Sequence, residues 1–247
     1  MESQLVDFHC HLDLFKDFEL IVKQTEEAKI HTLTVTTTPK AWPKNRDLTK
    51  DLKYVRAALG LHPQVVLERS EEIEIWKAFI NETRFIGEIG LDKGASHLSS
   101  IELQKKILKI ILVECAKSGD KILTLHSLRA STLLLDLLEE YFPPKKGKVI
   151  LHWFVGNKRD IERALALNCF FSINENMLKS EKGISLATTL PIERILTETD
   201  GPFIYRGNSP CKPLDVEYAV EKLSQIRKIE FTELKDSINH NLISLLQ

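Results

Sequence analysis

Eight short runs rich in β-branched residues alternate with longer segments whose apolar residues recur every three or four positions. This alternation constrains the fold of the 247-residue chain more than any other feature. It predicts a parallel sheet, because parallel strands need a crossover connection, usually a helix, between them. The predicted strands are residues 5–9, 32–37, 55–62, 85–91, 121–126, 149–153, 169–173 and 194–199.

The connections between these strands carry the apolar spacing of amphipathic helices. Predicted helices are residues 17–28, 71–80, 102–117, 133–141, 159–167 and 216–226, and the segments 44–53 and 182–190 are less clear. Eight strand–helix units in about 250 residues fit a (β/α)8 TIM barrel. We therefore predict one α/β barrel domain over residues 1–247. A doubly wound sheet would instead place a glycine-rich turn after the first strand, and the stretch LVDFHCHL contains no glycine.

Composition supports a sizeable core and limits the classes of partner. Hydrophobic residues make up 43% of the chain and the formal net charge is −1, which excludes a globally basic nucleic-acid-binding surface. No stretch has the roughly 18 apolar residues of a membrane span, and no signal peptide is expected at the start. Four widely spaced cysteines without a CxxC pair favour a reducing compartment. We expect a cytoplasmic protein.

Histidines and acids gather at or near the carboxyl ends of the predicted strands. Since parallel strands end at one face, these side chains should converge there. Imidazoles and carboxylates bind zinc, manganese or iron. Four histidines, a glutamate and an aspartate are more than one tetrahedral ion needs, whereas two ions sharing a carboxylate would use these six groups. Each residue alone has an ordinary structural explanation, but the whole set predicts a metal centre. The residues are His9, His11, His62, Glu88, Asp92, His126, His152 and Asp200.

Strand geometry refines this prediction. Side chains two residues apart on a strand point the same way, so His9 and His11 should share a direction and Cys10 should point to the other side. By the same rule Glu88 shares a face with Asp92, and Gly90 between them leaves room beside the carboxylate.

These stretches resemble the TatD family of metal-dependent hydrolases and deoxyribonucleases. The resemblance runs through DFHCHL at 7–12, GLHP at 60–63, GEIGLD at 87–92, HS at 126–127, HWF at 152–154 and TETDGP at 197–202. The strings DFHCHLDL, VTTTPKAW, ALGLHP, HWF and TETDGPF further resemble the TatD-like component of Qat anti-phage defence systems.

The resemblance implies a (β/α)8 barrel of the metallo-dependent hydrolase type that holds two divalent ions, magnesium, manganese or zinc. Glu88 would bridge the ions, and His62 would lie near the substrate phosphate. As a mechanism, we expect Asp200 to hold one ion and to accept a proton from the attacking water. Family members commonly cleave DNA, often from the 3′ end of single strands. The implied metal ligands are His9, His11, Glu88, His126, His152 and Asp200.

Three departures from the family pattern fall in loops that would hold the substrate. The acidic residue usual soon after the His-Ser pair is replaced by Arg129, and the aromatic residue that often follows Asp92 is replaced by Lys93. The usual basic loop after the last strand is shortened to residues 205–208. With His62, the predicted substrate contacts are Arg129, Trp153 and Arg206.

We therefore predict a metal-dependent phosphodiester hydrolase that acts on single-stranded DNA, with other proteins of a defence operon as further partners. We expect no membrane partner. Two alternatives stay open. A small-molecule amidohydrolase could use the same barrel, although many of these enzymes bridge their ions with a carbamylated lysine where this chain has Glu88. A non-catalytic subunit of a defence complex should have a broken ligand set, whereas all six ligands are present.

Overall fold

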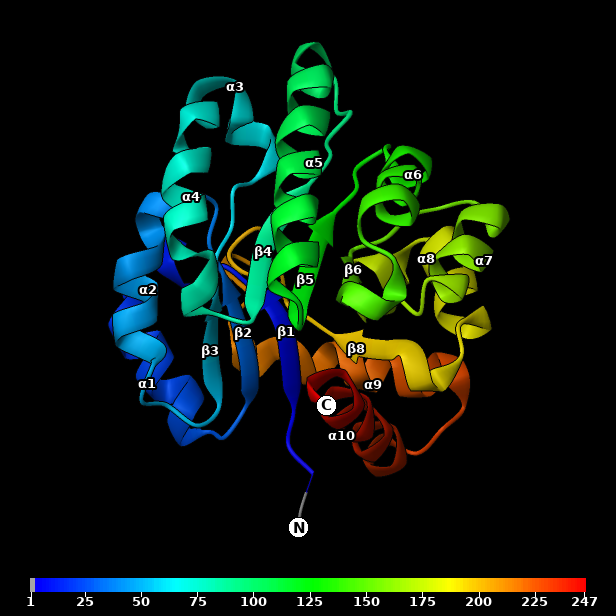
Figure 1. Ribbon diagram of the computed structural model, residues 1–247. Helices are drawn as coiled ribbons and strands as arrows, with labels where there is room; N and C mark the ends of the chain where they lie inside the picture. Colours follow the sequence, from blue (N-terminus) through cyan, green and yellow to red (C-terminus); the bar gives the residue numbers. More distant parts are fainter. Residues whose placement is uncertain (1–2) are drawn as a thin grey trace. The chain divides into compact units, whose positions relative to one another are not determined.

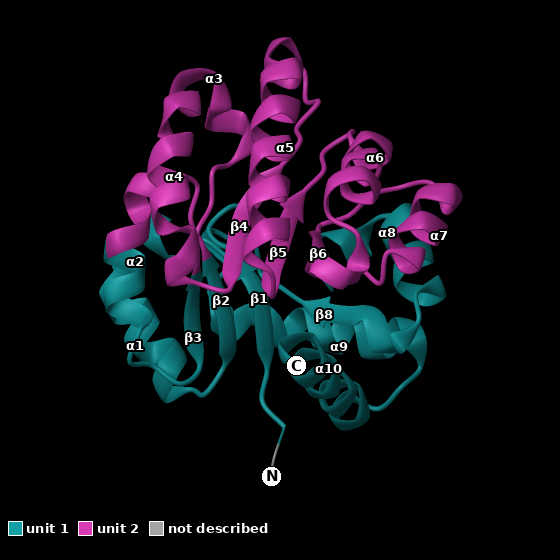
Figure 2. Cartoon of the chain, in the orientation of Figure 1, with its two compact units in different colours: residues 1–34, 44–57, 171–247 teal, residues 35–43, 58–170 magenta. Residues whose placement is uncertain are grey.

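The computed structural model describes residues 3–247, and the chain divides into two compact units, shown in different colours in Figure 2. Unit 1 contains the chain up to residue 34 together with residues 44–57 and 171–247. Unit 2 contains residues 35–43 and 58–170. That the chain forms a single domain stays a prediction. Within residues 3–247, none of the helices is long and apolar enough to cross a lipid bilayer.

Unit 1 carries most of five strands that correspond to predicted runs. Three of them form a sheet in the order β1-β2-β3, in which β1 and β2 are parallel, and the other two pair in parallel, with Phe171 opposite Ile195. A two-residue antiparallel pair, β9 (Tyr205–Arg206) with β10 (Ser209–Pro210), lies in the shortened loop near the end of the chain. The five strands are β1 (Val6–Cys10), β2 (His31–Val35), β3 (Val55–Ala58), β7 (Phe170–Ile173) and β8 (Ile195–Thr197).

Unit 2 is built on three parallel strands in the order β4-β5-β6. They are β4 (Phe85–Gly90), β5 (Lys121–His126) and β6 (Gly147–His152), and nearly every residue in them is buried. Burial on both faces explains why these strands appear in the sequence as continuous apolar runs rather than alternating ones. The long helix α5 (Ile101–Ser118) packs against β4 and β5 (Figure 1).

Helices follow the strands as predicted, and the two unclear segments form α2 and α8. Helix α7 shows how the local sequence sets a boundary, because Asn157 and Asp160 form a reciprocal capping box at its start. In unit 1 the helices are α1 (Phe18–Glu27), most of α2 (Trp42–Thr49), α8 (Glu181–Thr189), α9 (Val216–Arg227) and α10 (Phe231–Leu246). In unit 2 they are α3 (Val66–Arg69), α4 (Ile73–Phe79), α5, α6 (Ser131–Tyr141) and α7 (Lys158–Ala166).

Helix α10 is a structural element that the sequence analysis does not predict. It packs against β8 in unit 1, with Leu234, Ile238 and Leu242 buried at helical spacing (Figure 1). The buried side chain of Asn241 donates hydrogen bonds to the carbonyl of Ile192 at 2.7 Å and to that of Ile195 at 2.8 Å. The helix therefore fastens the end of the chain to the start of β8.

Gly90 has a different role from the one expected. Its φ angle is +142°, and a Cβ atom at this position would lie 2.1 Å from the carbonyl oxygen of His126 on β5. The space that the glycine provides is thus taken up by the backbone of the neighbouring strand and not by the Glu88 carboxylate. Gly90 is needed for the close approach of β4 to β5.

Candidate metal centre

In unit 2 the carboxylate of Glu88 faces three imidazoles. Its Oε1 atom lies 2.9 Å from Nδ1 of His126, 3.1 Å from Nε2 of His62 and 3.9 Å from Nε2 of His152. Glu88 is buried in β4, whereas His126 and His152 are the last residues of β5 and β6. The carboxyl-terminal parts of these parallel strands therefore bring Glu88, His126 and His152 together, as predicted. We call His62, Glu88, Asp92, His126 and His152 the Glu88 cluster.

His62 reaches this cluster from a loop and not from a strand end. The prediction that it closes a strand is wrong, because β3 ends at Ala58. His62 instead caps the short 3-10 helix Pro63–Val65, and its Nδ1 accepts a hydrogen bond from the backbone N–H of Gln64 at 3.2 Å. This bond leaves Nε2 as the nitrogen that faces Glu88.

Asp92 supports His126 from the far side of the imidazole ring. Its Oδ2 lies 3.0 Å from Nε2 of His126 and accepts a hydrogen bond of 2.7 Å from the side chain of Gln64. Burial alone would lower the pKa of His126, but hydrogen bonds to Asp92 and Glu88 outweigh it and raise the pKa to about 9. Burial likewise opposes ionisation of Asp92, yet its bonds to His126 and Gln64 hold its pKa well below the usual range. Gln64 is a residue of this cluster that the sequence analysis did not identify.

In unit 1, His9, His11 and Asp200 form a second group, which we call the His9 cluster. The rings of His9 and His11 lie 5.3 Å apart, and Nε2 of His11 lies 3.8 Å from Oδ1 of Asp200. Between the two histidines, Cys10 belongs to an apolar cluster with Leu12 and residues of α1. The predicted alternation of side chains at the end of β1 is therefore confirmed.

Asp200 also lies beyond its strand. The prediction that it closes a strand is wrong, since β8 ends at Thr197. The backbone of Asp200 is in the left-handed region, with φ of 51°, and its N–H donates to the carbonyl of His9 at 2.9 Å. Non-glycine residues rarely adopt such angles, and they are often found at functional sites. The ring of Phe203 lies edge-on to His11, with 5.0 Å between the centroids, although 59% of Phe203 is exposed.

Two buried carboxylates of unit 1 were not assigned from the sequence, although both lie in the stretches that carry the family resemblance. Glu198 accepts hydrogen bonds from the side chains of Ser172 and Asn174. Asp7 is completely buried, and this burial raises its pKa to about 8, against the lowering effect of hydrogen bonds from Thr199. Each carboxylate lies two residues from a predicted ligand, Asp7 from His9 and Glu198 from Asp200.

The remaining predicted substrate contacts lie in loops after strands. Arg129 is exposed three residues after His126, and Trp153 directly follows β6, with its ring 6.3 Å from that of His152. Both residues have positive φ angles, 54° for Arg129 and 39° for Trp153. Arg206 lies in β9, with its guanidinium carbon 2.9 Å from the centroid of the Tyr218 ring. The roles of these residues as substrate contacts stay predictions.

The donor atoms of His62, Glu88 and His126 suit a divalent cation. One nitrogen or oxygen from each residue lies within 4.8 Å of the others, which is close enough for the three to reach a single ion. Imidazole nitrogen with carboxylate oxygen is the donor combination of zinc, manganese and iron sites. Asp92 and Gln64 behind His126 supply the outer hydrogen bonds that orient such ligands.

Comparison with known proteins is consistent with this chemistry. The family model described as TatD related DNase matches residues 6–247. A putative deoxyribonuclease TATDN1 homologue of Vairimorpha ceranae is 27% identical over 97% of this chain and 94% of its own. The deoxyribonuclease Tat-D of Schizosaccharomyces pombe is 24% identical over 97% of this chain and 90% of its own. The crystal structure of YjjV, a TatD homologue from Escherichia coli, superposes with a TM-score of 0.87 at 24% identity, covering 99% of this chain and 98% of that one.

The parallel α/β fold and the histidine–carboxylate clusters define a metal-dependent hydrolase that acts on ester bonds. The chain belongs to the TatD family. The predicted fold class is confirmed, because the strand–helix order and the match to YjjV are those of the TatD fold, with which a (β/α)8 barrel of the metallo-dependent hydrolase type is consistent.

Proposed function

We propose that this chain is a divalent-metal-dependent DNase that removes nucleotides from the 3′ end of single-stranded DNA. The observation that carries the proposal is the position of the buried Glu88 carboxylate opposite His62, His126 and His152, because such a set binds a cation strongly and reaches a phosphodiester beside it. The two relatives whose names describe deoxyribonucleases support DNA as the substrate class.

The proposed metal ligands are those implied by the family resemblance. Divalent ions would supply Lewis-acid chemistry, activating water near neutral pH and offsetting the charge that builds on a phosphoryl oxygen. The donor set would accept two ions, with the Glu88 carboxylate shared between them, and magnesium, manganese and zinc are the candidates. The proposed ligands are His9, His11, Glu88, His126, His152 and Asp200.

Residues of the chain would supply the proton transfer and the contacts to the substrate. Asp200 would take the proton that leaves the attacking water, since its carboxylate lies beside His11, with Oδ1 3.8 Å from Nε2 of the imidazole. His62 would lie near the substrate phosphate. Arg129 and Arg206 would pair with phosphates of the strand, whereas Trp153 would stack on a base.

A metal-replacement experiment tests this function. Protein stripped of metal would be supplied with magnesium, manganese or zinc and given single-stranded DNA labelled at its 5′ end. A ladder of progressively shorter labelled strands is expected, because removal of nucleotides from the 3′ end leaves the label on the remainder. Duplex DNA, RNA and small amide and lactone substrates would be assayed in parallel. If no metal restores cleavage of any nucleic acid while an amide or lactone is hydrolysed, the proposed substrate class is wrong.

We further propose that the enzyme acts in the cytoplasm as part of an anti-phage defence operon and contacts other proteins of that operon. The stretches that resemble Qat components support the defence role, and the four buried cysteines, all of them free thiols, fit a reducing compartment. Plaque counts on cells carrying the operon with the wild-type chain or with Glu88→Gln would test the defence role. Equal plaque counts for the two strains would contradict a defence role for the catalytic activity.

A further inference from the structure

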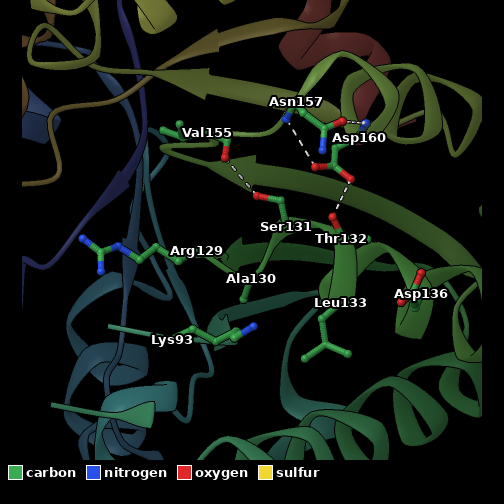
Figure 3. Close-up of a pocket in the computed structure, with 10 residues that line it drawn as sticks. All are labelled: Lys93, Arg129, Ala130, Ser131, Thr132, Leu133, Asp136, Val155, Asn157 and Asp160. Atoms are coloured by element: carbon green, nitrogen blue, oxygen red, sulfur yellow. Dashed lines mark hydrogen bonds between the residues drawn. The ribbon is translucent and has the colours of Figure 1, made fainter. Parts of the chain in front are cut away.

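A pocket of about 450 Å³ lies in unit 2 and is lined by the loops after β4, β5 and β6 and by the start of helix α6 (Figure 3). Two of its lining residues are close in the chain to the cluster, since Lys93 follows Asp92 and Arg129 comes three residues after His126. The backbone N–H of Lys93 donates to the carbonyl of Leu128 at 2.9 Å, which joins the loop of Lys93 to the loop of Arg129.

The acidic residues of the pocket are already paired with other groups. Asp136 binds the guanidinium of Arg163 at 2.6 Å. Asp160 accepts a hydrogen bond of 2.9 Å from the hydroxyl of Thr132, and another of 3.2 Å from the backbone N–H of Asn157. In the view of Figure 3 both carboxylates lie to the right of the pocket, away from Lys93 and Arg129 on the left. Neither carboxylate is therefore needed to balance the charge of these two residues.

Two basic side chains, those of Lys93 and Arg129, line the pocket. Among residues 3–247, the side chains of Lys93 and Arg129 make neither a hydrogen bond nor an ion pair, and both residues are exposed. Helix α6 begins at Ser131 on the pocket wall, and its first turn adds the positive end of the helix dipole. Lys93 and Arg129 thus present two positive charges that no side chain among residues 3–247 pairs with.

Both basic residues stand where this chain departs from the pattern of the family it resembles. Arg129 occupies the place of a customary acid, and Lys93 occupies the place of a frequent aromatic residue. The two departures fall in one pocket and change its charge in the same direction. The two side chains give this part of the pocket a positive charge, which attracts an anion.

We propose that Lys93 and Arg129 form a phosphate subsite, which holds a nucleic-acid phosphate next to the one cleaved at the Glu88 cluster. The inference rests on the proposed function, and the subsite would give the substrate a second point of attachment. The pocket is large enough for a nucleotide, and Val155 and Leu133 offer an apolar wall for its sugar or base. The phosphate is either an internal one of the strand or the one at its end, and both have the chemistry that these cations recognise.

Binding of a fluorescein-labelled thymidine decamer tests the subsite without any turnover. Anisotropy would be measured in EDTA over a range of salt concentrations, for the wild-type chain and for the double variant Lys93→Ala/Arg129→Gln. Each phosphate contact with a single strand contributes about 0.7 to the slope of log Kd against log salt, so losing two contacts should flatten the slope by about 1.4. At low salt the Kd should rise about tenfold or more. Arg129→Asp, which restores the family's acidic residue, should weaken binding more than Arg129→Gln.

The double variant Lys145→Ala/Lys146→Ala is the matched control. It removes the same charge from exposed residues of unit 2 that precede β6, at the end of the strand opposite the pocket. Its slope should equal that of the wild-type chain.

A decamer carrying a 3′-phosphate separates the two sources of phosphate. A gain in affinity that disappears in the Lys93/Arg129 variant assigns the subsite to the terminal phosphate, and no gain assigns it to an internal one.

The subsite and the proposed function can fail separately. If the decamer does not bind the wild-type chain, or if both double variants give the same slope, the subsite is wrong whatever the enzyme cleaves. If binding depends on Lys93 and Arg129 but no metal supports cleavage, the subsite stands and the proposed nuclease activity is wrong.

Discussion

The buried carboxylate of Asp7 in β1 accepts two hydrogen bonds from Thr199, one from its backbone N–H at 2.8 Å and one from its hydroxyl at 2.6 Å. Thr199 immediately precedes Asp200, and β1 also carries His9. This pair therefore fastens the loop that follows β8 to the strand that presents the first histidine. It sets the backbone on which the His9 cluster depends.

Thr199→Val should destabilise the protein by about 1–3 kcal/mol, because the variant keeps the shape of the side chain but leaves one buried oxygen of Asp7 without its donor. The free energy of unfolding in urea would measure the loss. Thr188→Val is the matched control, since the Thr188 hydroxyl bonds only a carbonyl on the exposed face of α8. The control should stay within about 0.5 kcal/mol of the wild-type value. Equal losses of unfolding free energy in the two variants would show that the buried bond to Asp7 stabilises the protein no more than the exposed bond of Thr188 does.

Glu88→Gln should abolish metal-dependent cleavage while the protein stays folded. The amide keeps the size of the carboxylate but loses the charge that holds a cation and faces three imidazoles. Activity should fall by more than the roughly 10–100-fold that is typical of an outer-shell partner. The change would be followed by cleavage rate and by calorimetric titration with manganese. Glu114→Gln removes the same charge from α5, where Glu114 pairs with Lys117, and should leave both measurements unchanged. Wild-type cleavage by the Glu88 variant would contradict the assignment.

The strands were predictable because each is a buried parallel strand and therefore a short apolar run between polar connections. β5 coincides with its predicted range, and the start of β4 is also correct. Helix α10 is not predicted although its buried leucines have helical spacing. The reason is that the predicted helix over residues 216–226 already completes the eighth strand–helix unit. The division into two units has no local signal at all, since it depends on contacts between distant segments.

The candidate ligands were predictable in type but not in detailed position. Residues at real strand ends, such as His126 and His152, follow from the strand pattern alone. His62 and Asp200 lie beyond their strands, in a helix cap and a left-handed turn, and such geometry is not periodic. Partners such as Gln64 are invisible from the sequence, because a neutral side chain acquires its role only when Asp92 comes within hydrogen-bonding distance.

Gly90→Ala should cost about 3 kcal/mol or more, or prevent folding. The new Cβ would lie 2.1 Å from the carbonyl of His126, and the φ of +142° is unfavourable for any residue with a side chain. Thermal or urea unfolding gives the comparison. Gly119→Ala is the control, because Gly119 also has a positive φ, of +70°, but no atom lies within 4 Å of the added Cβ. The control isolates backbone strain and should cost about 1 kcal/mol. Similar values for both variants would mean that β4 can move away from β5.

His31 should make the protein less stable as the pH falls. Burial at the start of β2 lowers its pKa below the ordinary 6.5, and the nearby Lys53 and Arg56 lower it further, against the opposing effect of Glu26. The unfolded chain therefore binds the proton more readily than the folded one. The resulting stability is fully present above about pH 6.5 and is lost as the pH falls from there through the lowered pKa of the folded state.

His31→Gln should accordingly flatten the curve of unfolding free energy against pH between about pH 7 and 5. Urea unfolding at half-unit steps of pH would define the curve for each protein. His240→Gln serves as the control, because His240 is exposed on α10 in the same unit and keeps its contact with water on folding. Its curve should run parallel to that of the wild-type chain. If the His31 variant loses stability on acidification as steeply as the wild-type chain does, other groups carry the acid sensitivity and burial of His31 has no measurable part in it.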